Sequence, residues 1–206
     1  SSKQLDDPKR GFSYRYDVKL DMRMNTDQKI SAYDIVNTYT EEQLSKIIFE
    51  YGEERHARKI AKLIVEERKS SPIEKTSDLI TLIKRAYPER ASKHPAKKTF
   101  QAIRIEVNRE LEVLGNAISK AAELLKVGGR LAIITFHSLE DRIVKNKFKD
   151  LATACKCPKD IPICVCGGVK KFEIITKKPI IPIDDELKNN NRAHSSKLRI
   201  LERILD

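Results

Sequence analysis

Residues Gly128 to Lys145, GGRLAIITFHSLEDRIVK, carry the clearest secondary-structure signal in the sequence. The two glycines of this stretch favour the end of a preceding helix, because glycine readily takes the left-handed backbone that closes one. Residues 131–136 form a short continuous apolar run, which is typical of a strand covered on both faces, as in a parallel sheet. Ser138 and Asp141 then have the spacing of a capping box that begins another helix. The stretch therefore predicts a helix, a strand and a helix, and so an α/β fold.

His137 lies where the predicted strand meets the predicted second helix. In open α/β sheets, ligands bind beyond the carboxyl ends of the strands. An imidazole at such a place can hold or accept a proton near neutral pH. His137 is therefore the candidate catalytic residue. The alternative interpretation is a histidine that only bonds to the neighbouring backbone.

The chain before this stretch has a helical pattern. Residues 40–87 predict three short amphipathic helices in succession, the first capped by Thr40 with Gln43 and the third capped by Thr76. Residues 99–126 carry apolar side chains at every third or fourth position and predict one long helix. After the central stretch, residues 172–176 and 196–204 predict two further strands.

These patterns predict three parts. An irregular segment at 1–39 belongs to the main α/β domain, an all-helical subdomain is inserted at 40–93, and residues 94–206 complete the α/β domain. The expected fold class is therefore α/β with a helical insertion.

The chain is basic. Its 206 residues include 41 Lys and Arg against 30 Asp and Glu, which gives a formal net charge of +11 and favours polyanionic partners. From Arg142 to Lys178 there are ten basic and three acidic residues. Tryptophan is absent and aromatic residues are few, so contacts to phosphates are expected rather than base stacking. We expect a cytoplasmic protein with no membrane partner, because the chain has neither a secretory signal nor an apolar run of about 18 residues.

Four cysteines lie close together in CKCPKDIPICVC: Cys155, Cys157, Cys164 and Cys166. In an extended chain, residues two apart point to the same side, so a hairpin would bring four sulfurs together. One interpretation is a structural zinc site, although zinc sites commonly use the wider C-x-x-C spacing. Reduced thiols packed in a hairpin are a second interpretation. Disulfides are a third, which a reducing cytoplasm disfavours.

Four blocks of the sequence resemble the MraW/RsmH family, in the family's order. They are GFSYRYDVKLDMRM (11–24), YGEERHARKIA (51–61), HPAKKTFQAIRIEVNREL (94–111) and FHSLEDRIVK (136–145). The resemblance covers essentially the whole chain. It implies an S-adenosylmethionine-dependent methyltransferase that acts on the N4 amine of a cytidine in 16S ribosomal RNA of the small (30S) subunit. It also implies that the chain forms the C-terminal part of a Rossmann-like class I methyltransferase sheet.

The resemblance assigns several residues to the cofactor and substrate sites. The first six residues fall within a family motif close to DLGVSSPQLD, which implies that Gln4 contacts S-adenosylmethionine, although Lys3 replaces the usual proline. Phe12, Asp21 and Arg23 are candidates for lining the substrate cleft. The alternative for Asp21 is a structural ion pair with Arg23 or Arg15.

The resemblance also predicts what this chain lacks. We expect the family's glycine-rich cofactor loop, and the strands that accompany it, to precede Ser1. This chain alone is then expected to bind S-adenosylmethionine poorly. The strand at 131–136 should keep an unpaired apolar edge, through which the chain can form a homodimer.

Basic residues provide the candidate RNA contacts. Lys97, Lys98 and Arg104 cluster at the start of a predicted helix, where exposed backbone amides and positive charge suit a phosphate. The alternative is a capped helix with solvated lysines. Arg192, just before the last predicted strand, is a further candidate. A non-catalytic RNA-binding module is the rival function.

Overall fold

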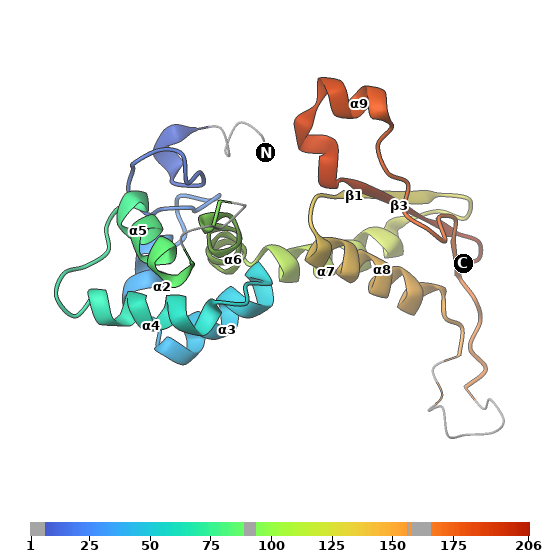
Figure 1. The fold of residues 1–206 in the computed structure, drawn as a ribbon. Helices are drawn as coiled ribbons and strands as arrows, with labels where there is room; N and C mark the ends of the chain where they lie inside the picture. The colour runs from blue at the N-terminus through green and yellow to red at the C-terminus, as the bar shows by residue number, and fades with distance from the viewer. Residues whose placement is uncertain (1–6, 89–93, 156, 158–165) are drawn as a thin grey trace. The chain divides into compact units, whose positions relative to one another are not determined.

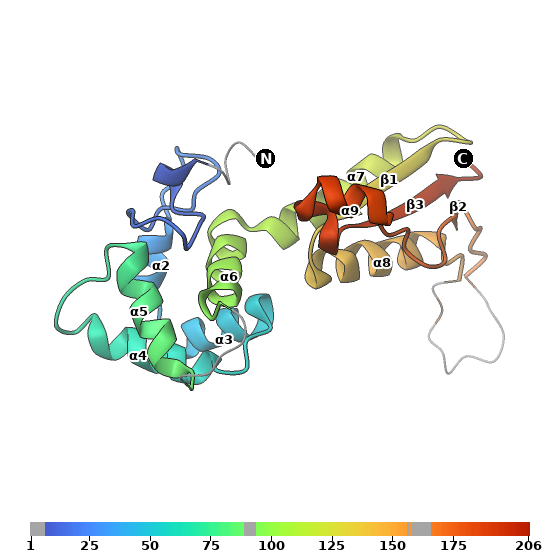
Figure 2. The same ribbon diagram turned by 45° about the horizontal axis from the view of Figure 1, so that its top comes forward.

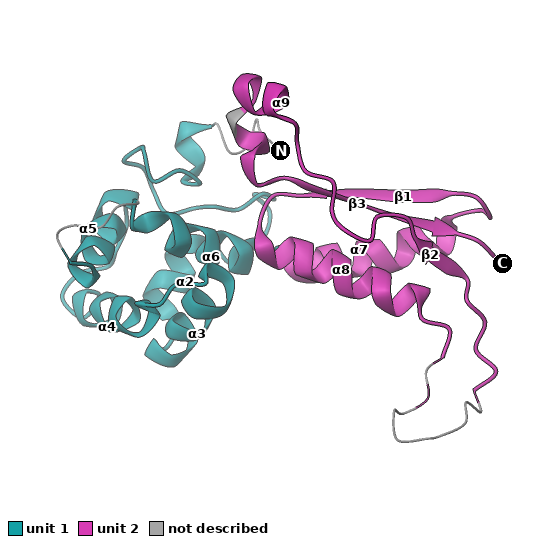
Figure 3. Cartoon of the chain, turned by 45° about the vertical axis from the view of Figure 1, so that its right-hand side comes forward, with its two compact units in different colours: residues 1–110 teal, residues 111–206 magenta. Residues whose placement is uncertain are grey.

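The structure is a computed structural model that describes residues 7–88, 94–155, 157 and 166–206. The chain divides into two compact units, residues 1–110 (unit 1) and 111–206 (unit 2), which Figure 3 shows in teal and magenta. These bounds differ from the three predicted parts, because one hydrophobic core joins residues from Phe12 to Val107.

Unit 1 is helical. Its elements are η1 (Pro8–Arg10), α2 (Ala32–Thr38), α3 (Glu41–Gly52), α4 (Ala57–Glu67), α5 (Thr76–Ala86) and α6 (Ala96–Asn108), and α7 (Glu110–Leu124) begins at its last residue. The capping box of Thr40 and Gln43 at the start of α3 is confirmed. The predicted cap Thr76 is instead the first residue of α5, since its hydroxyl accepts a hydrogen bond from Val18 N at 3.1 Å and Lys75 precedes it as the cap residue.

The core of unit 1 is built around α3, which packs against α4 and α6 (Figure 1). Ile48 on α3, Ile60 on α4 and Ile103 on α6 are each fully buried. Leu20 and Met22, in the predicted irregular segment, join the same core. That segment also contains α2, which begins with a capping box of Ser31 and Asp34.

The predicted long helix at 99–126 is interrupted at Arg109. This residue ends α6 in the left-handed region, at φ 49° and ψ 37°. The next residue, Glu110, starts α7 and forms a two-pronged ion pair with Arg104, with nitrogen to oxygen distances of 2.8 and 3.1 Å. The prediction of one helix is therefore wrong, and two helices meet at a residue that is neither glycine nor proline.

Arg109→Gly is expected to raise the free energy of unfolding by up to about 1 kcal/mol, because glycine takes a left-handed backbone without steric cost. Urea unfolding measures the change. In the matched control Lys62→Gly, at an exposed position inside α4, the same free energy should fall by about 1 kcal/mol. A similar loss in Arg109→Gly would contradict the assignment of backbone strain to this position.

Unit 2 contains a small sheet. Its elements after α7 are β1 (Arg130–Thr135), α8 (Ser138–Ala152), β2 (Phe172–Ile174), α9 (Asp184–Asn189), η2 (Asn191–Ser195) and β3 (Lys197–Arg203). The strand order is β1-β3-β2, with β3 antiparallel to both neighbours. The three predicted strands and the α/β class are thus confirmed.

Helices α7 and α8 lie on the same face of this sheet, below it in Figure 1; Figure 2 shows the same sheet with its top turned forward. The core between them joins Ile118 on α7 and Phe148 on α8 with Leu201 on β3. On β1, alternate residues face the helices, whereas Ile134 on the other side is 59% exposed and Phe136, just after the strand, is 55% exposed.

The prediction of a parallel strand covered on both faces is therefore not met. Within the described residues, β1 is an antiparallel edge strand whose only partner is β3. Nothing in the described ranges covers its second face, which leaves the apolar run half exposed. Among these same residues, none of the helices has the length and apolar character needed to cross a membrane.

Candidate functional site

His137 lies at the carboxyl end of β1, at the junction predicted from sequence. Its extended backbone, φ −144° and ψ 165°, makes it the N-cap of α8. The ring Nδ1 accepts a hydrogen bond from Glu140 N at 3.4 Å, and Nε2 lies 3.4 Å from Glu140 Oε1. The side chain is 11% exposed. The junction thus holds an imidazole and a carboxylate in contact at the end of a strand.

The helix cap itself is placed one residue earlier than predicted. Glu140, not Asp141, is the acidic partner of the capping box, and its carboxylate accepts hydrogen bonds from Phe136 N at 2.8 Å and His137 N at 3.3 Å. The predicted pairing of Ser138 with Asp141 is therefore wrong. The physical reason for the difference is that the carboxylate of Asp141 binds Arg199 instead.

Asp141 binds two cations on β3. Arg199 donates to its carboxylate at 2.7 and 3.2 Å, and Lys197 Nζ lies 3.3 Å away. Both Asp141 and Arg199 are 8% exposed. Hydrogen bonding from Arg199 holds the pKa of Asp141 below its usual value, with a further contribution from Lys197. This buried network ties the first turn of α8 to the central strand of the sheet, and periodicity alone does not reveal it.

A basic pocket of about 450 Å³ lies beside α8 and β2. Four exposed lysines line it, of which three are Lys145 and Lys149 on α8 and Lys177 after β2. Lys170 also lines the pocket, but its Nζ lies 3.4 Å from Glu173. The pocket gathers part of the basic excess that the sequence shows between Arg142 and Lys178, so it is a candidate site for anionic groups.

A second pocket, of about 310 Å³, lies in unit 1 and is lined in part by Asp21 and Arg23. These two residues form an ion pair, with Arg23 Nε and Nη2 lying 2.7 and 3.1 Å from the Asp21 carboxylate. The remaining guanidinium nitrogen donates to Thr26 O and Gln28 O. Burial opposes ionisation of Asp21, but the hydrogen bonds from Arg23 outweigh it and lower the pKa of the Asp21 carboxyl.

The geometry therefore matches both interpretations of Asp21 and Arg23: they form a structural ion pair, and they line a pocket. Phe12 is different. Its ring is only 8% exposed, belongs to the hydrophobic core of unit 1 and is not among the residues that line this pocket. Phe12 thus packs in the core of unit 1, and its place in the substrate cleft stays a prediction.

The predicted RNA contacts in unit 1 share helix α6. Lys97 is exposed in the first turn, and Lys98 donates from Nζ to Glu53 O at 2.7 Å. Arg104 is engaged by Glu110 and is 22% exposed. In unit 2, Arg192 lies exposed in η2. Lys97 and Lys98 thus lie in the first turn of α6, as predicted, whereas the guanidinium of Arg104 is paired with Glu110.

Three of the four cysteines come together. The sulfurs of Cys155, Cys157 and Cys166 all lie within 4.8 Å of one another. Cys164 and the predicted cofactor contact Gln4 lie outside the described residues.

The described residues do not by themselves form a binding loop for S-adenosylmethionine. In residues 7–88, 94–155, 157 and 166–206, two connections lead from a strand to a helix: residues 136–137 between β1 and α8, and residues 175–183 between β2 and α9. Neither contains a glycine. A dinucleotide- or nucleoside-type loop needs glycine so that the backbone can approach the ligand.

Comparison with known proteins identifies the family. A model of the MraW methylase family matches residues 1–204. The chain is 97% identical over 206 residues to the ribosomal RNA small subunit methyltransferase H of Fusobacterium nucleatum subsp. nucleatum, which covers 100% of this chain and 66% of that protein. It is 56% identical over 207 residues to the protein of the same name from Clostridioides difficile, covering 99% of this chain and 67% of that protein.

The chain thus spans about two thirds of the length of these relatives. The resemblance first drawn from four sequence blocks is confirmed. This chain belongs to the MraW methylase family.

Proposed function

We propose that the protein containing this chain methylates ribosomal RNA of the small subunit, with S-adenosylmethionine as the methyl donor. The observation that carries the proposal is the 97% identity, over all 206 residues, to a protein named ribosomal RNA small subunit methyltransferase H. The donor supplies an electrophilic methyl group. The proposed partner is the 16S RNA or the 30S subunit that contains it, and the proposed location is the cytoplasm.

We further propose that the methyl acceptor is the N4 amine of a cytidine, as the family resemblance implies. The lone pair of this amine is delocalised into the base, so the amine is a weak nucleophile. Holding it in line with the methyl group supplies much of the rate, and an acceptor for its proton supplies more. The base must be presented unpaired or turned out of its stack. In this chain, His137 is the proposed proton acceptor. Its Nδ1 accepts a hydrogen bond from Glu140 N, so the proton would go to Nε2, where the neighbouring Glu140 carboxylate would stabilise the imidazolium.

The product tests the acceptor. The full-length protein is incubated with labelled S-adenosylmethionine and with small subunits from cells that lack the enzyme, and the RNA is digested to nucleosides for mass spectrometry. We expect the label in N4-methylcytidine. Label in a different methylated nucleoside would overturn the N4 assignment while leaving methyl transfer in place.

The basic pocket of unit 2 is the proposed contact for RNA phosphates. Lys145, Lys149 and Lys177 present three exposed ammonium groups around a cavity that is large enough for backbone groups of a nucleic acid. Arg199 also lines the pocket, but it is neutralised by Asp141. Lysines that contact phosphates release counterions, which gives affinity without sequence preference. Lys97, Lys98 and Arg192 remain proposed additional contacts.

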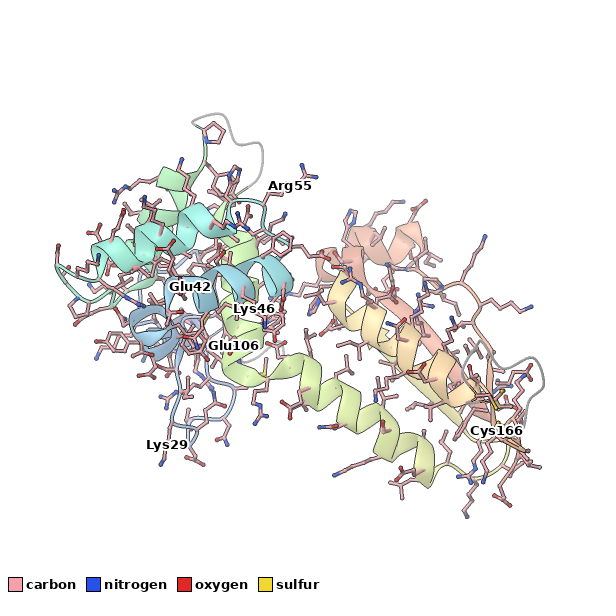
Figure 4. The ribbon with its side chains drawn as sticks, turned by 90° about the horizontal axis from the view of Figure 1, so that it is seen from below. Lys29, Glu42, Lys46, Arg55, Glu106 and Cys166 are labelled. Carbon is pink, nitrogen blue, oxygen red and sulfur yellow. The ribbon has the colours of Figure 1, made fainter. Side chains whose placement is uncertain are left out.

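Lys149→Glu combined with Lys177→Glu is expected to weaken RNA binding by about tenfold or more. It should also reduce the slope of log affinity against log salt by about two, because about one counterion is released per lysine contact. Filter binding at several salt concentrations measures both quantities. The matched control reverses Lys46 and Lys59, two exposed lysines of unit 1, of which Figure 4 labels Lys46. Equal losses in the two double variants would mean that net charge, not the pocket, sets the affinity.

The rival function is a non-catalytic RNA-binding module, which the basic pocket also supports. It predicts binding to small-subunit RNA with no methyl incorporation by the full-length protein.

Association of two copies through the outer edge of β1 also remains a proposal. It is supported by the position of β1 at the edge of the sheet and by the exposure of Ile134 on β1 and of Phe136 just after it.

A further inference from the structure

Three thiols converge in unit 2, just beyond Ala152 and Thr153 at the end of α8, which line the basic pocket proposed for RNA. Cys155 and Cys157 follow the end of α8, and Cys166 precedes β2. Figure 4 shows Cys166 in unit 2 near the end of α8. The three sulfurs lie within 4.8 Å of one another, and those of Cys155 and Cys166 are 3.9 Å apart. The methyltransferase proposal gives this cluster no role.

The spacing of the sulfurs suits a tetrahedral metal. Zinc binds thiolate sulfur at about 2.3 Å, so two sulfurs on one tetrahedral zinc ion are roughly 3.8 Å apart. The distance of 3.9 Å between the sulfurs of Cys155 and Cys166 agrees with this value. A site whose ligands are all sulfur selects zinc over magnesium or calcium, which prefer oxygen. In the described part of the chain, this group contains no carboxylate or imidazole.

Beside the cluster, the segment that contains Cys166 lies so close to the segment that contains Cys155 that no side chain fits between their backbones at residue 168. A Cβ atom on Gly168 would lie 1.9 Å from the carbonyl oxygen of Ala154 and 3.2 Å from Cys166 Sγ. Any other residue at 168 would therefore push the Cys166 segment away from the Cys155 segment. Gly167 has φ +57°, a left-handed turn that follows Cys166 directly. Two consecutive glycines thus make the close approach of the thiols possible.

We propose that Cys155, Cys157 and Cys166 bind one zinc ion as thiolates. The ion would join the segment that leaves α8 to the segment that enters β2, since its ligands come from both. Such a metal link stabilises the folded state directly, because the unfolded chain does not hold its ligands together. Binding releases the three thiol protons to solvent and involves no change of oxidation state.

Metal analysis of the full-length protein, purified under reducing conditions without added metal, tests the site. We expect about one zinc ion per chain, and a large loss of zinc from each of Cys155→Ser, Cys157→Ser and Cys166→Ser. The matched control is Lys170→Ala, an exposed change in the same segment, which should keep its zinc. Zinc-free protein, or zinc retained at full occupancy in all three serine variants, would overturn the proposal.

A second measurement does not depend on the folding of the variants. After exchange of the native protein into cobalt(II), we expect intense visible absorption and a near-ultraviolet sulfur-to-metal charge-transfer band, both of which report tetrahedral thiolate ligation. Cobalt that binds with only the weak spectrum of oxygen ligands would contradict the site. So would a native mass that shows a disulfide between these cysteines in protein purified with reductant. Methyl transfer is not measured in either experiment, so failure of the zinc site leaves the proposed activity untouched.

Discussion

Asp141→Ala is expected to lower the free energy of unfolding by about 3 to 5 kcal/mol, because removing one member of a buried ion pair leaves the other charge unpaired. Arg199, 8% exposed, donates two hydrogen bonds to this carboxylate, at 2.7 and 3.2 Å. The carboxylate also binds Lys197, so two cations on β3 depend on one residue of α8. Urea unfolding followed by circular dichroism measures the loss.

The matched control for this substitution is Glu173→Ala. Glu173 also pairs with a lysine in unit 2, but its side chain is 53% exposed and that of Lys170 is 48% exposed. Exposed pairs contribute about 0 to 1 kcal/mol. If both substitutions cost less than about 1 kcal/mol, the Asp141 network does not hold α8 to the sheet.

The same network should make stability depend on pH in the acid range. Arg199 and Lys197 lower the pKa of folded Asp141, so the unfolded state binds the proton more tightly than the folded state. The stabilisation is complete above the ordinary aspartate pKa of about 4 and is lost as the pH falls through the lower folded value. Asp141→Asn should flatten this part of the curve of unfolding free energy against pH. An unchanged acid slope would contradict the assignment.

His137→Asn is expected to slow methyl transfer by about a hundredfold or more in the full-length protein, if the imidazole accepts the amine proton. The choice of asparagine separates two roles of this residue. His137 caps α8 through Nδ1, and asparagine is among the best N-cap residues. Its side chain can therefore keep the helix start while removing the proton acceptor. Single-turnover kinetics with labelled S-adenosylmethionine measure the step.

The comparison with His137→Ala completes this test. Alanine removes both the cap and the imidazole, so it should lose about 1 kcal/mol of stability as well as activity. Asparagine should lose activity alone. Wild-type turnover in His137→Asn would exclude the imidazole from the chemistry and leave His137 as a helix cap.

The sheet of unit 2 could be predicted from the sequence because each strand carries a local signal. Residues 131–136 are a continuous apolar run and residues 196–204 alternate, and these became β1 and β3. The helix starting at Thr40 was equally clear from its capping box. The break between two helices at Arg109 could not be predicted from the sequence. The apolar periodicity continues through this residue, and no glycine or proline marks its left-handed backbone.

The start of α8 shows why local spacing was insufficient. His137 with Glu140 and Ser138 with Asp141 are two possible capping pairs, one residue apart, and spacing alone does not choose between them. The choice depends on Arg199, which lies 58 residues after Asp141 in the chain and binds it. A contact of that range has no local signal.

The candidate sites were predictable to different degrees for the same reason. The concentration of lysines after Arg142 indicated a basic surface, but which of them share a pocket depends on how α8 packs beside β2. Asp21 and Arg23 are two residues apart, so their ion pair could be inferred from spacing. The burial of Phe12 in the core could not be inferred from the sequence, because it follows from the tertiary packing of unit 1.

Methyl incorporation into intact ribosomal subunits distinguishes an RNA methyltransferase from a protein that only binds RNA. The full-length protein is incubated with tritium-labelled S-adenosylmethionine and with purified small or large subunits, and the label in the extracted RNA is counted. We expect stoichiometric labelling of RNA from small subunits of cells that lack the enzyme, and background labelling of RNA from large subunits. Background labelling of both, by protein that is shown to be folded and bound to small subunits, would contradict the proposed methyl transfer.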